Sequence, residues 1–210
     1  MTGRKSPRAP TLRRTETEGR FFMDKKQLRA QLKGRLLELT NGRHVEKSRR
    51  ACEKLVDTPQ FRQSDTIMFY LSLPHETDTT PAMLKAWESG KTVVVPKVLW
   101  KQKRMIAVKI DSLAAGFSTK VAGLRNPTAE THFALEDINL VIVPGVGFDR
   151  DGNRLGTGNG YYDKFFDDDS LVATRCGLAY SEQLVDFIPA DEHDKPMDLI
   201  VTDEEVIYFK

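Results

Sequence analysis

Residues 140–163 read LVIVPGVGFDRDGNRLGTGNGYYD, and we expect the rest of the chain to be organised around this stretch. Its first four residues are apolar and mostly β-branched, and Pro144-Gly145 stops them, which is the pattern of a buried strand that ends in a turn. A glycine-dense loop follows, with glycines at positions 145, 147, 152, 156, 158 and 160. The last three alternate with other residues, so successive backbone N–H groups can converge on one point.

Charged and aromatic residues stand on both sides of the alternating glycines. Arg154 precedes them, and the YYDKFF segment that begins at Tyr161 predicts a helix. Backbone N–H groups that converge at a helix N-terminus beside an arginine form an anion site, most often for phosphate. A plain surface loop, with Arg154 paired to Asp149 or Asp151 to hold its shape, is the alternative. We favour the anion site because so many of these residues share so short a segment.

Two well-known phosphate motifs do not match this loop. A dinucleotide fingerprint opens directly from the first strand of a βαβ unit, and this loop does not. A Walker A loop continues with Gly-Lys-Ser/Thr, which is missing here. The loop therefore belongs to another class of anion site.

Length and composition describe an ordinary globular protein. The chain has 210 residues, 40% of them hydrophobic and 30% charged, which favours one domain with a full core. A net charge of +2 argues against a nucleic-acid partner, and no apolar run approaches the about 18 residues of a membrane helix. Cys52 and Cys176 are too few and too isolated for a disulfide framework or a thiolate metal site, which favours a reducing cytosol.

The chain is expected to begin with a tail. Residues 1–22 are rich in Arg, Lys, Pro, Thr and Glu without periodicity, which predicts disorder ahead of a single domain at 23–210. The tail lacks the apolar core of a signal peptide, and Met23 is a candidate start of the protein.

A helix is predicted directly after this tail. Asp24 is its candidate N-cap, and leucines at positions 28, 32, 36 and 39 share one face. Lys25, Lys26 and Arg29 lie in its first turns, where their charge opposes the helix macrodipole. A solvated basic face and a ligand-binding face remain equally open from these residues alone.

Further along, helices and strands alternate. Helices are predicted at 44–56 and 81–88, and strands at 66–71, 91–95 (ended by Pro96), 105–110, 138–143, 172–179, 199–202 and 206–209, with a turn at 123–127. This order predicts an α/β fold: a three-layer, mostly parallel sheet with helices on both faces. The loops after residues 71, 95, 143 and 179 all follow strand C-terminal ends, where such sheets bind ligands.

Acidic residues in these loops are candidate ligand contacts. Glu76 follows a predicted buried strand and can accept hydrogen bonds from an N–H-rich heterocycle such as a pterin, or can simply cap the loop. Asp163 lies next to the anion loop, where a carboxylate is a natural Mg²⁺ ligand beside phosphate, or a helix cap. A second acid for the metal is expected within residues 191–198.

Aromatic residues gather around the same loops: Phe69, Tyr70, Phe148, Tyr161 and Tyr162. Aromatic side chains are more often core than ligand contacts. Adjacent residues of the Tyr161-Tyr162 pair cannot both face one core, however, so at least one is expected to reach the site.

The loop residues resemble the signature of the 5-formyltetrahydrofolate cyclo-ligase family, also called 5,10-methenyltetrahydrofolate synthetases. The resemblance rests on Arg154-Leu155-Gly156-x-Gly158-x-Gly160-Tyr161-Tyr162-Asp163, preceded by Val143-Pro144-Gly145-x-Gly147-Phe148-Asp149, and extends loosely over residues 24–205. It implies a Rossmann-like sheet of the kind found in sugar-phosphate isomerases and CoA transferases. It also implies a cytoplasmic ATP-dependent ligase of one-carbon metabolism, with Mg²⁺ as cofactor.

The resemblance assigns roles to individual residues. It implies ATP contacts from Lys25, Lys26, Arg29, Arg154, Gly156, Thr157, Gly158, Asn159, Gly160, Tyr161 and Tyr162, with Arg29 and Arg154 catalytic and Lys97 a further cation. It implies substrate contacts from Leu71, Glu76, Phe148, Tyr161 and Tyr162. It implies metal ligation by Asp163 and Asp194. Asn159 stands where the family pattern has glycine or lysine, and Asn126 where many relatives carry an acid before Pro127.

The implied reaction closes 5-formyltetrahydrofolate to 5,10-methenyltetrahydrofolate with release of ADP and phosphate. Phosphorylation of the formyl oxygen makes it a good leaving group, and N10 then closes the ring. This chemistry needs a phosphate cradle, Mg²⁺ and cations, and no protein nucleophile. Two rivals stay open: a sugar-phosphate isomerase or CoA-transferase-like enzyme, and a folate- or nucleotide-binding paralogue without turnover. We expect a monomer that acts on small molecules.

Overall fold

The structure is a computed structural model that describes residues 13–14, 21–119 and 124–209. The predicted tail falls outside these residues, apart from two short strands that pair antiparallel, β1 (Arg13–Arg14) and β2 (Phe21–Phe22). The main body begins with the helix at residue 25.

Seven strands form the main sheet: β3 (Thr66–Met68), β4 (Thr92–Leu99), β5 (Arg104–Lys109), β8 (Leu140–Val143), β11 (Thr174–Leu178), β13 (Leu199–Val201) and β14 (Val206–Tyr208). Their order across the sheet is β14-β13-β11-β8-β3-β4-β5. The five inner strands are parallel, and the edge strands β14 and β5 are antiparallel to their neighbours. The mostly parallel α/β sheet that the sequence predicts is confirmed.

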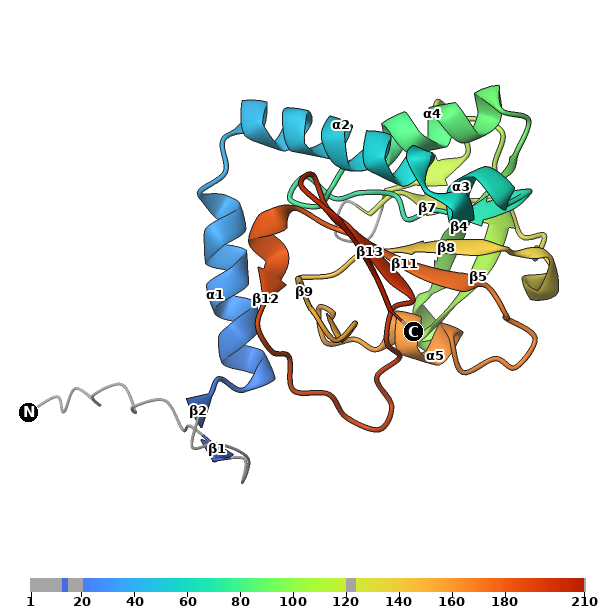
Figure 1. Cartoon of the computed structure of the whole chain (residues 1–210). Helices are drawn as coiled ribbons and strands as arrows, with labels where there is room; N and C mark the ends of the chain where they lie inside the picture. Colours follow the sequence, from blue (N-terminus) through green and yellow to red (C-terminus); the bar gives the residue numbers. More distant parts are fainter. Residues whose placement is uncertain (1–12, 15–20, 120–123, 210) are drawn as a thin grey trace, which may run out of the picture.

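Helices cover both faces of this sheet (Figure 1). One face packs against α2 (Asn41–Asp57), α3 (Pro59–Gln63) and α4 (Thr80–Glu88). The other packs against the short α5 (Tyr161–Phe165) and irregular segments. Alternation along each strand divides the side chains between the two faces, as in β8, where Ile142 joins the first cluster and Val141 the second.

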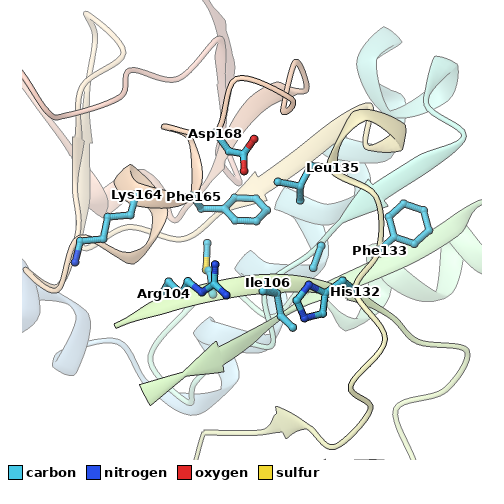
Figure 2. A pocket seen from close by; sticks show the side chains of 10 residues that line it. Arg104, Ile106, His132, Phe133, Leu135, Lys164, Phe165 and Asp168 are labelled. Carbon is cyan, nitrogen blue, oxygen red and sulfur yellow. The ribbon is translucent and has the colours of Figure 1, made fainter. Parts of the chain in front are cut away.

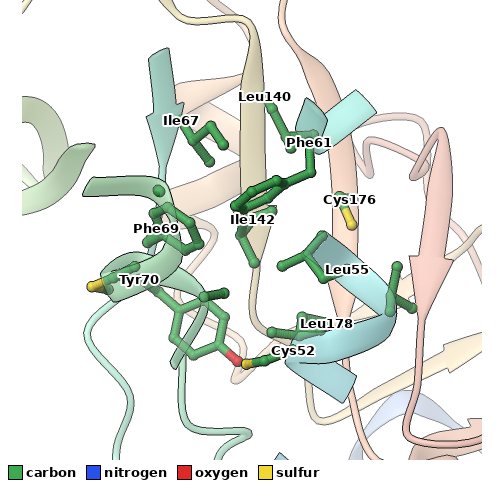
Figure 3. Packing of buried hydrophobic residues seen from close by; sticks show 14 of the residues in the cluster. Cys52, Leu55, Phe61, Ile67, Phe69, Tyr70, Leu140, Ile142, Cys176 and Leu178 are labelled. Carbon is green, nitrogen blue, oxygen red and sulfur yellow. The ribbon is translucent and has the colours of Figure 1, made fainter. Parts of the chain in front are cut away.

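The larger core lies beneath α2, α3 and α4. Figure 3 shows Leu55 and Phe61 reaching down from these helices onto strand residues such as Ile142. Cys52 and Cys176 lie in this cluster as free, buried thiols. The apolar strands of the sequence are therefore buried on both sides, as parallel strands usually are.

Helix α1 (Lys25–Leu37) stands apart from the main sheet and packs on a smaller one. This second sheet has the order β10 (Arg154–Leu155), β9 (Gly147–Asp149) and β12 (Leu184–Val185). Leu28 and Leu32 of α1 form a third buried cluster with Val146, Leu155 and Ile188. The predicted cap is confirmed, since Asp24 accepts a hydrogen bond from the Gln27 backbone and forms a capping box.

The strand predicted at 91–95 is longer than expected, and the expectation that Pro96 ends it is wrong. Ile110 N donates to Val93 O, so alternation along the antiparallel ladder puts Pro96 opposite Ala107 in a non-hydrogen-bonded position. The ring nitrogen of Pro96 thus faces the other side, where β3 has already ended at Met68. No hydrogen bond is lost there, and β4 continues to Leu99.

The turn predicted at 123–127 is wrong where the structure describes it. Asn126–Pro127 is a strand, β7, that pairs with β6 (Phe117–Ser118). The Asn126 side chain also accepts from Val98 N (2.7 Å) and donates to Val98 O (3.1 Å). An aspartate there has no N–H for the second bond, so the asparagine is explained by the fold.

The fold makes a prediction at two glycines. A Cβ added at Gly177 of β11 lies 2.6 Å from the buried ring of Phe148, whereas one added at Gly34 of α1 meets nothing within 4 Å. We expect Gly177→Ala to lower the free energy of unfolding by about 1–3 kcal/mol through overpacking. The control, Gly34→Ala, should raise it by about 0.5–1 kcal/mol because alanine is the better helix former. Urea denaturation checks both, and a Gly177→Ala protein as stable as the wild type contradicts this packing.

Candidate functional site

The hairpin in front of the glycine loop is held by one buried carboxylate. Asp149 has no exposed surface and accepts four hydrogen bonds, from Asp151 N (3.0 Å), Asn153 N (2.9 Å), Asn153 Nδ2 (2.9 Å) and Ile188 N (2.8 Å). The first three bonds shape the turn between β9 and β10, and the fourth ties that turn to a distant segment. Arg154, the first residue of β10, is thereby placed at the sheet edge.

Arg154 lies under the loop, and its guanidinium faces away from water. Its side chain is 6% exposed, Nη2 lies 2.7 Å from Asp163 Oδ1, and its guanidinium carbon sits 5.5 Å from the centroid of the Tyr162 ring. The alternative pairing with Asp149 or Asp151 is wrong, because the Asp149 oxygens are used by backbone and amide donors. Within the described residues, Arg154 Nε has no hydrogen-bond partner.

The loop at 156–160 leaves its backbone donors free. In the part of the chain that the structure describes, the N–H groups of these residues have no protein acceptor, and residues 157–159 are exposed. Gly158 and Gly160 take positive φ, at 104° and 66°, which L side chains rarely adopt. Because α5 has only five residues, its dipole adds little, and an anion here must be held by the loop N–H groups and nearby cations.

Helix α1 reaches this loop from the other side. Arg29 Nε donates to Gly156 O at 2.7 Å. One turn earlier, Lys25 Nζ pairs with Asp191 Oδ2 (2.6 Å) and Asp194 Oδ2 (2.5 Å). These carboxylates offset the positive charge that the sequence places at the start of α1, which explains how the helix tolerates it.

The contacts join six charged side chains into one cluster. Lys25 and Arg29 are neighbours on one helix face, and Arg29 donates a hydrogen bond to the carbonyl oxygen of Gly156. A Cβ added at Gly156 would lie 2.8 Å from Arg154 Nη1, so the Arg154 side chain lies on the other side of the same residue. The cluster contains three cations and three carboxylates, so its formal charge is zero: Lys25, Arg29, Arg154, Asp163, Asp191 and Asp194. We call this set the charged cluster.

The charge of Glu76 influences Tyr162, which lies next to the glycine loop. The Glu76 carboxylate accepts from Leu73 N at 2.9 Å, and burial raises its pKa above the ordinary value of 4.5. Burial also raises the pKa of the Tyr162 hydroxyl, with a smaller contribution from the nearby Glu76 charge. Glu76 is therefore close enough to Tyr162 for its negative charge to affect the pKa of that hydroxyl.

The two adjacent tyrosines point to different neighbours. Tyr162 lies against Arg154, whereas Tyr161 makes an edge contact with Trp100, with ring centroids 6.3 Å apart. Trp100 is 39% exposed and was missed by the sequence analysis. The position of Trp100 depends on β4 continuing past Pro96 to Leu99, and no local feature of the sequence predicts that continuation.

Other predicted site residues lie further back or stand apart. Phe148 has no exposed surface and Leu71 only 5%, so both support the site from within the core. Lys97 donates to the carbonyl oxygens of Thr128 and Ala129 rather than facing the loop. Three others are exposed and form no described side-chain hydrogen bond: Lys26, Thr157 and Asn159.

A cavity of about 210 Å³ lies between β5 and α5 (Figure 2). Phe165 and Leu135 form its apolar wall, and Arg104, His132 and Asp168 line it with polar groups. None of the residues that line it belongs to the predicted site. The candidate site is therefore the open surface around the glycine loop and not this cavity.

These features define an α/β protein with a loop suited to phosphate at the C-terminal ends of its strands. The 5-formyltetrahydrofolate cyclo-ligase family profile matches residues 22–203, and the chain belongs to that family. The family resemblance predicted from the sequence is confirmed.

Relatives and solved structures agree with this assignment. The mouse 5-formyltetrahydrofolate cyclo-ligase is 29% identical over 86% of this chain and 94% of its own, and that of Escherichia coli K12 is 26% identical over 80% and 94%. The structure of Aquifex aeolicus 5,10-methenyltetrahydrofolate synthetase matches with a TM-score of 0.76 and 28% identity, over 88% of this chain and 92% of that one. The Mycoplasma pneumoniae synthetase matches with a TM-score of 0.70 and 26% identity, over 86% and 99%.

Among the described residues, no helix combines the length and the apolar character needed to cross a membrane.

The raised pKa of Glu76 predicts a pH-dependent stability. The penalty for burying its charged form is absent below the ordinary pKa of 4.5 and complete above the folded-state pKa, so this group lowers the free energy of unfolding as pH rises between them. Glu76→Gln keeps an acceptor for Leu73 N and removes the charge. We expect the variant to gain stability relative to the wild type as the pH rises above about 4.5.

Urea denaturation at several pH values checks this prediction, with the exposed Glu130→Gln as control. The control should leave the pH slope of stability unchanged. A Glu76→Gln slope equal to that of the wild type would contradict the burial of this carboxylate.

Proposed function

We propose that this protein catalyses the ATP-dependent cyclisation of 5-formyltetrahydrofolate to 5,10-methenyltetrahydrofolate. The γ-phosphoryl group moves from ATP to the formyl oxygen and leaves ADP. N10 attacks the formyl carbon and loses its proton, and the carbon–oxygen bond breaks to release phosphate. The observation that carries the proposal is a loop whose N–H groups have no acceptor among the described residues and which lies between two arginines, in a chain that belongs to the cyclo-ligase family.

The chain's own groups suit phosphate recognition. The N–H groups of residues 156–160 are free to cradle the triphosphate of ATP. Arg154 can offer a guanidinium fork to its oxygens, and Arg29, which already holds the loop through Gly156, lies where it can contact both nucleotide and folate. Lys25 adds a third cation.

The donor set also fits Mg²⁺. The ion pair of Asp163 uses Oδ1, and both hydrogen bonds to Asp194 end on Oδ2, so each carboxylate keeps one oxygen for another partner. Among the described residues no group of three or more His, Cys, Asp or Glu gathers for a metal. Two carboxylates suit Mg²⁺, which is usually held by one or two carboxylates together with substrate phosphates. There it would neutralise charge on the transferring phosphoryl group.

The folate side of the proposal rests on Glu76 and the two tyrosines. The partly buried carboxylate of Glu76 can accept hydrogen bonds from the N–H groups of a pterin ring. Tyr161, backed by Trp100, and Tyr162, backed by Arg154, provide aromatic surfaces next to the loop.

A covalent protein intermediate is not part of this proposal. Burial raises the pKa of the Cys52 thiol to about 12, and burial also raises the pKa of Cys176, so neither forms a thiolate nucleophile readily. Catalysis then depends on positioning and on charge stabilisation.

The direct test is product formation. Absorbance of the methenyl product should rise when the full chain meets 5-formyltetrahydrofolate with Mg-ATP, and should not rise without ATP. Nucleotide and folate binding without any product would instead favour the non-catalytic paralogue.

Arg154 provides a sharper prediction. We expect Arg154→Ala to weaken ATP binding about tenfold to a hundredfold, as for loss of charged hydrogen bonds that contribute about 1.5–3 kcal/mol, and Arg154→Lys to do less. Because the side chain is buried against Asp163, Arg154→Ala should also lower the melting temperature of the free protein. The deciding measurement is the further rise in melting temperature when Mg-ATP is added.

The control is an arginine of the same hairpin. Arg150 is 60% exposed and pairs with Glu205, so Arg150→Ala should keep the full Mg-ATP shift. A full shift and normal turnover in Arg154→Ala would remove Arg154 from the site.

We also propose that the chain acts as a monomer in the cytosol. Cys52 and Cys176 are buried, unpaired thiols, which suits a reducing compartment. Light scattering at micromolar concentration tests the monomer.

A further inference from the structure

Each phosphate-binding cation of the proposed site except Arg29 is already paired with an acid. Arg154 holds Asp163 at 2.7 Å, and Lys25 holds Asp194 at 2.5 Å. These two acids are also the proposed magnesium ligands. The groups meant for the nucleotide and the groups meant for the metal therefore neutralise each other in the free protein.

Both ion pairs are partly buried, so their attraction can compete with ligand binding. Side-chain exposure is 6% and 22% for Arg154 and Asp163, and 20% and 27% for Lys25 and Asp194. Exposed ion pairs contribute little because water screens them, whereas partly buried ones are screened less. An anion that approaches Arg154 or Lys25 must compete with a carboxylate, and a cation that approaches Asp163 or Asp194 must compete with an ammonium or guanidinium.

We propose that nucleotide and metal bind by an exchange of partners within the charged cluster. Lys25 and Arg154 pass from Asp194 and Asp163 to the phosphate oxygens, and the two released carboxylates take the divalent cation. This inference rests on the proposed function. It adds that the ion pairs couple the two ligands, so each strengthens the binding of the other by the same factor.

The two cations are placed differently for the exchange. The Arg154 guanidinium lies directly beside the glycine loop, since a Cβ at Gly156 would lie 2.8 Å from Nη1. Lys25 has a second acid, Asp191, at 2.6 Å, and Asp191 is 73% exposed. Asp191 also donates its backbone N–H to Asp194 Oδ2 at 2.7 Å, so it orients Asp194. Asp191 is thus a positioning residue that keeps Lys25 beside the site once Asp194 has turned to the metal.

The exchange predicts that two substitutions of acidic residues raise the affinity for metal-free ATP, although both remove proposed metal ligands. A carboxylate that serves only as a metal ligand should weaken metal-free ATP binding only slightly, through the screened repulsion of its negative charge. A carboxylate that occupies the phosphate-binding cation should weaken it. We therefore expect Asp163→Asn and Asp194→Asn to bind metal-free ATP more tightly than the wild type, by about fivefold or more, and to lose most of the gain that Mg²⁺ gives the wild type.

The experiment is calorimetric titration of the full chain with ATP, without folate, once in EDTA and once in excess Mg²⁺. Asp191→Asn is the matched control, because it removes a charge from the same lysine but supplies no proposed metal ligand. It should tighten metal-free binding less than Asp194→Asn, since Asp191 is the more exposed, and should lose less of the Mg²⁺ gain, because only the placement of Lys25 changes. Circular dichroism and melting curves confirm that each variant is folded.

Asp163→Asn and Asp194→Asn should differ in how much they lower the stability of the fold, so at least one variant remains available for the test. Asp163→Asn leaves a buried guanidinium unpaired and should melt lower, whereas in Asp194→Asn Lys25 keeps Asp191. If Asp163→Asn does not fold, Asp194→Asn decides alone. Metal-free ATP affinity in Asp194→Asn equal to or below that of the wild type overturns the exchange.

Failure of the exchange and failure of the proposed function look different in this experiment. If the wild type binds ATP neither in EDTA nor with Mg²⁺, the proposed nucleotide site is wrong. If the wild type binds Mg-ATP while the carboxylate variants gain nothing in EDTA, the site stands and the exchange is wrong.

Discussion

The buried carboxylate of Asp149 is the constraint on which the site depends. A charged group without exposed surface is stable only when hydrogen-bonded, and here four N–H donors reach it. Those donors come from the β9–β10 turn and from Ile188, so one group sets the shape of the hairpin and its distance from the chain's C-terminal third. The glycine loop and Arg154 follow directly from that hairpin. The position of the glycine loop is thus a consequence of satisfying one acid in the core.

The second organising feature is the neutrality of the charged cluster. Helix α1 is apolar on the face that packs against Val146 and Ile188, and basic at the end that meets the loop. Lys25 at that end would oppose the helix dipole, but it finds two acids from the chain's last quarter. The same contacts that dock α1 onto the domain thereby bring cations and acids close to the loop, so folding itself forms the charged cluster.

The sequence predicted those parts of the molecule that depend on local signals. The buried strand at 140–143 and the Asp24 cap each rest on a few neighbouring residues. Features that depend on distant neighbours were missed. The length of β4 depends on where β3 ends, and the partners of Lys25 lie 166 and 169 residues away. Arg154 pairs with Asp163 rather than the nearer Asp149, because backbone donors already occupy that acid.

We propose that the formyl oxygen is phosphorylated and that this chain acts by positioning, with no covalent intermediate of its own. The fate of that oxygen distinguishes this mechanism from others. The full chain should be given Mg-ATP and 5-formyltetrahydrofolate whose formyl oxygen is a heavy stable isotope, and the phosphate released should be analysed by mass spectrometry. The account predicts that the label appears in inorganic phosphate, one labelled oxygen in each molecule. Unlabelled phosphate, with the label lost to water, would contradict it.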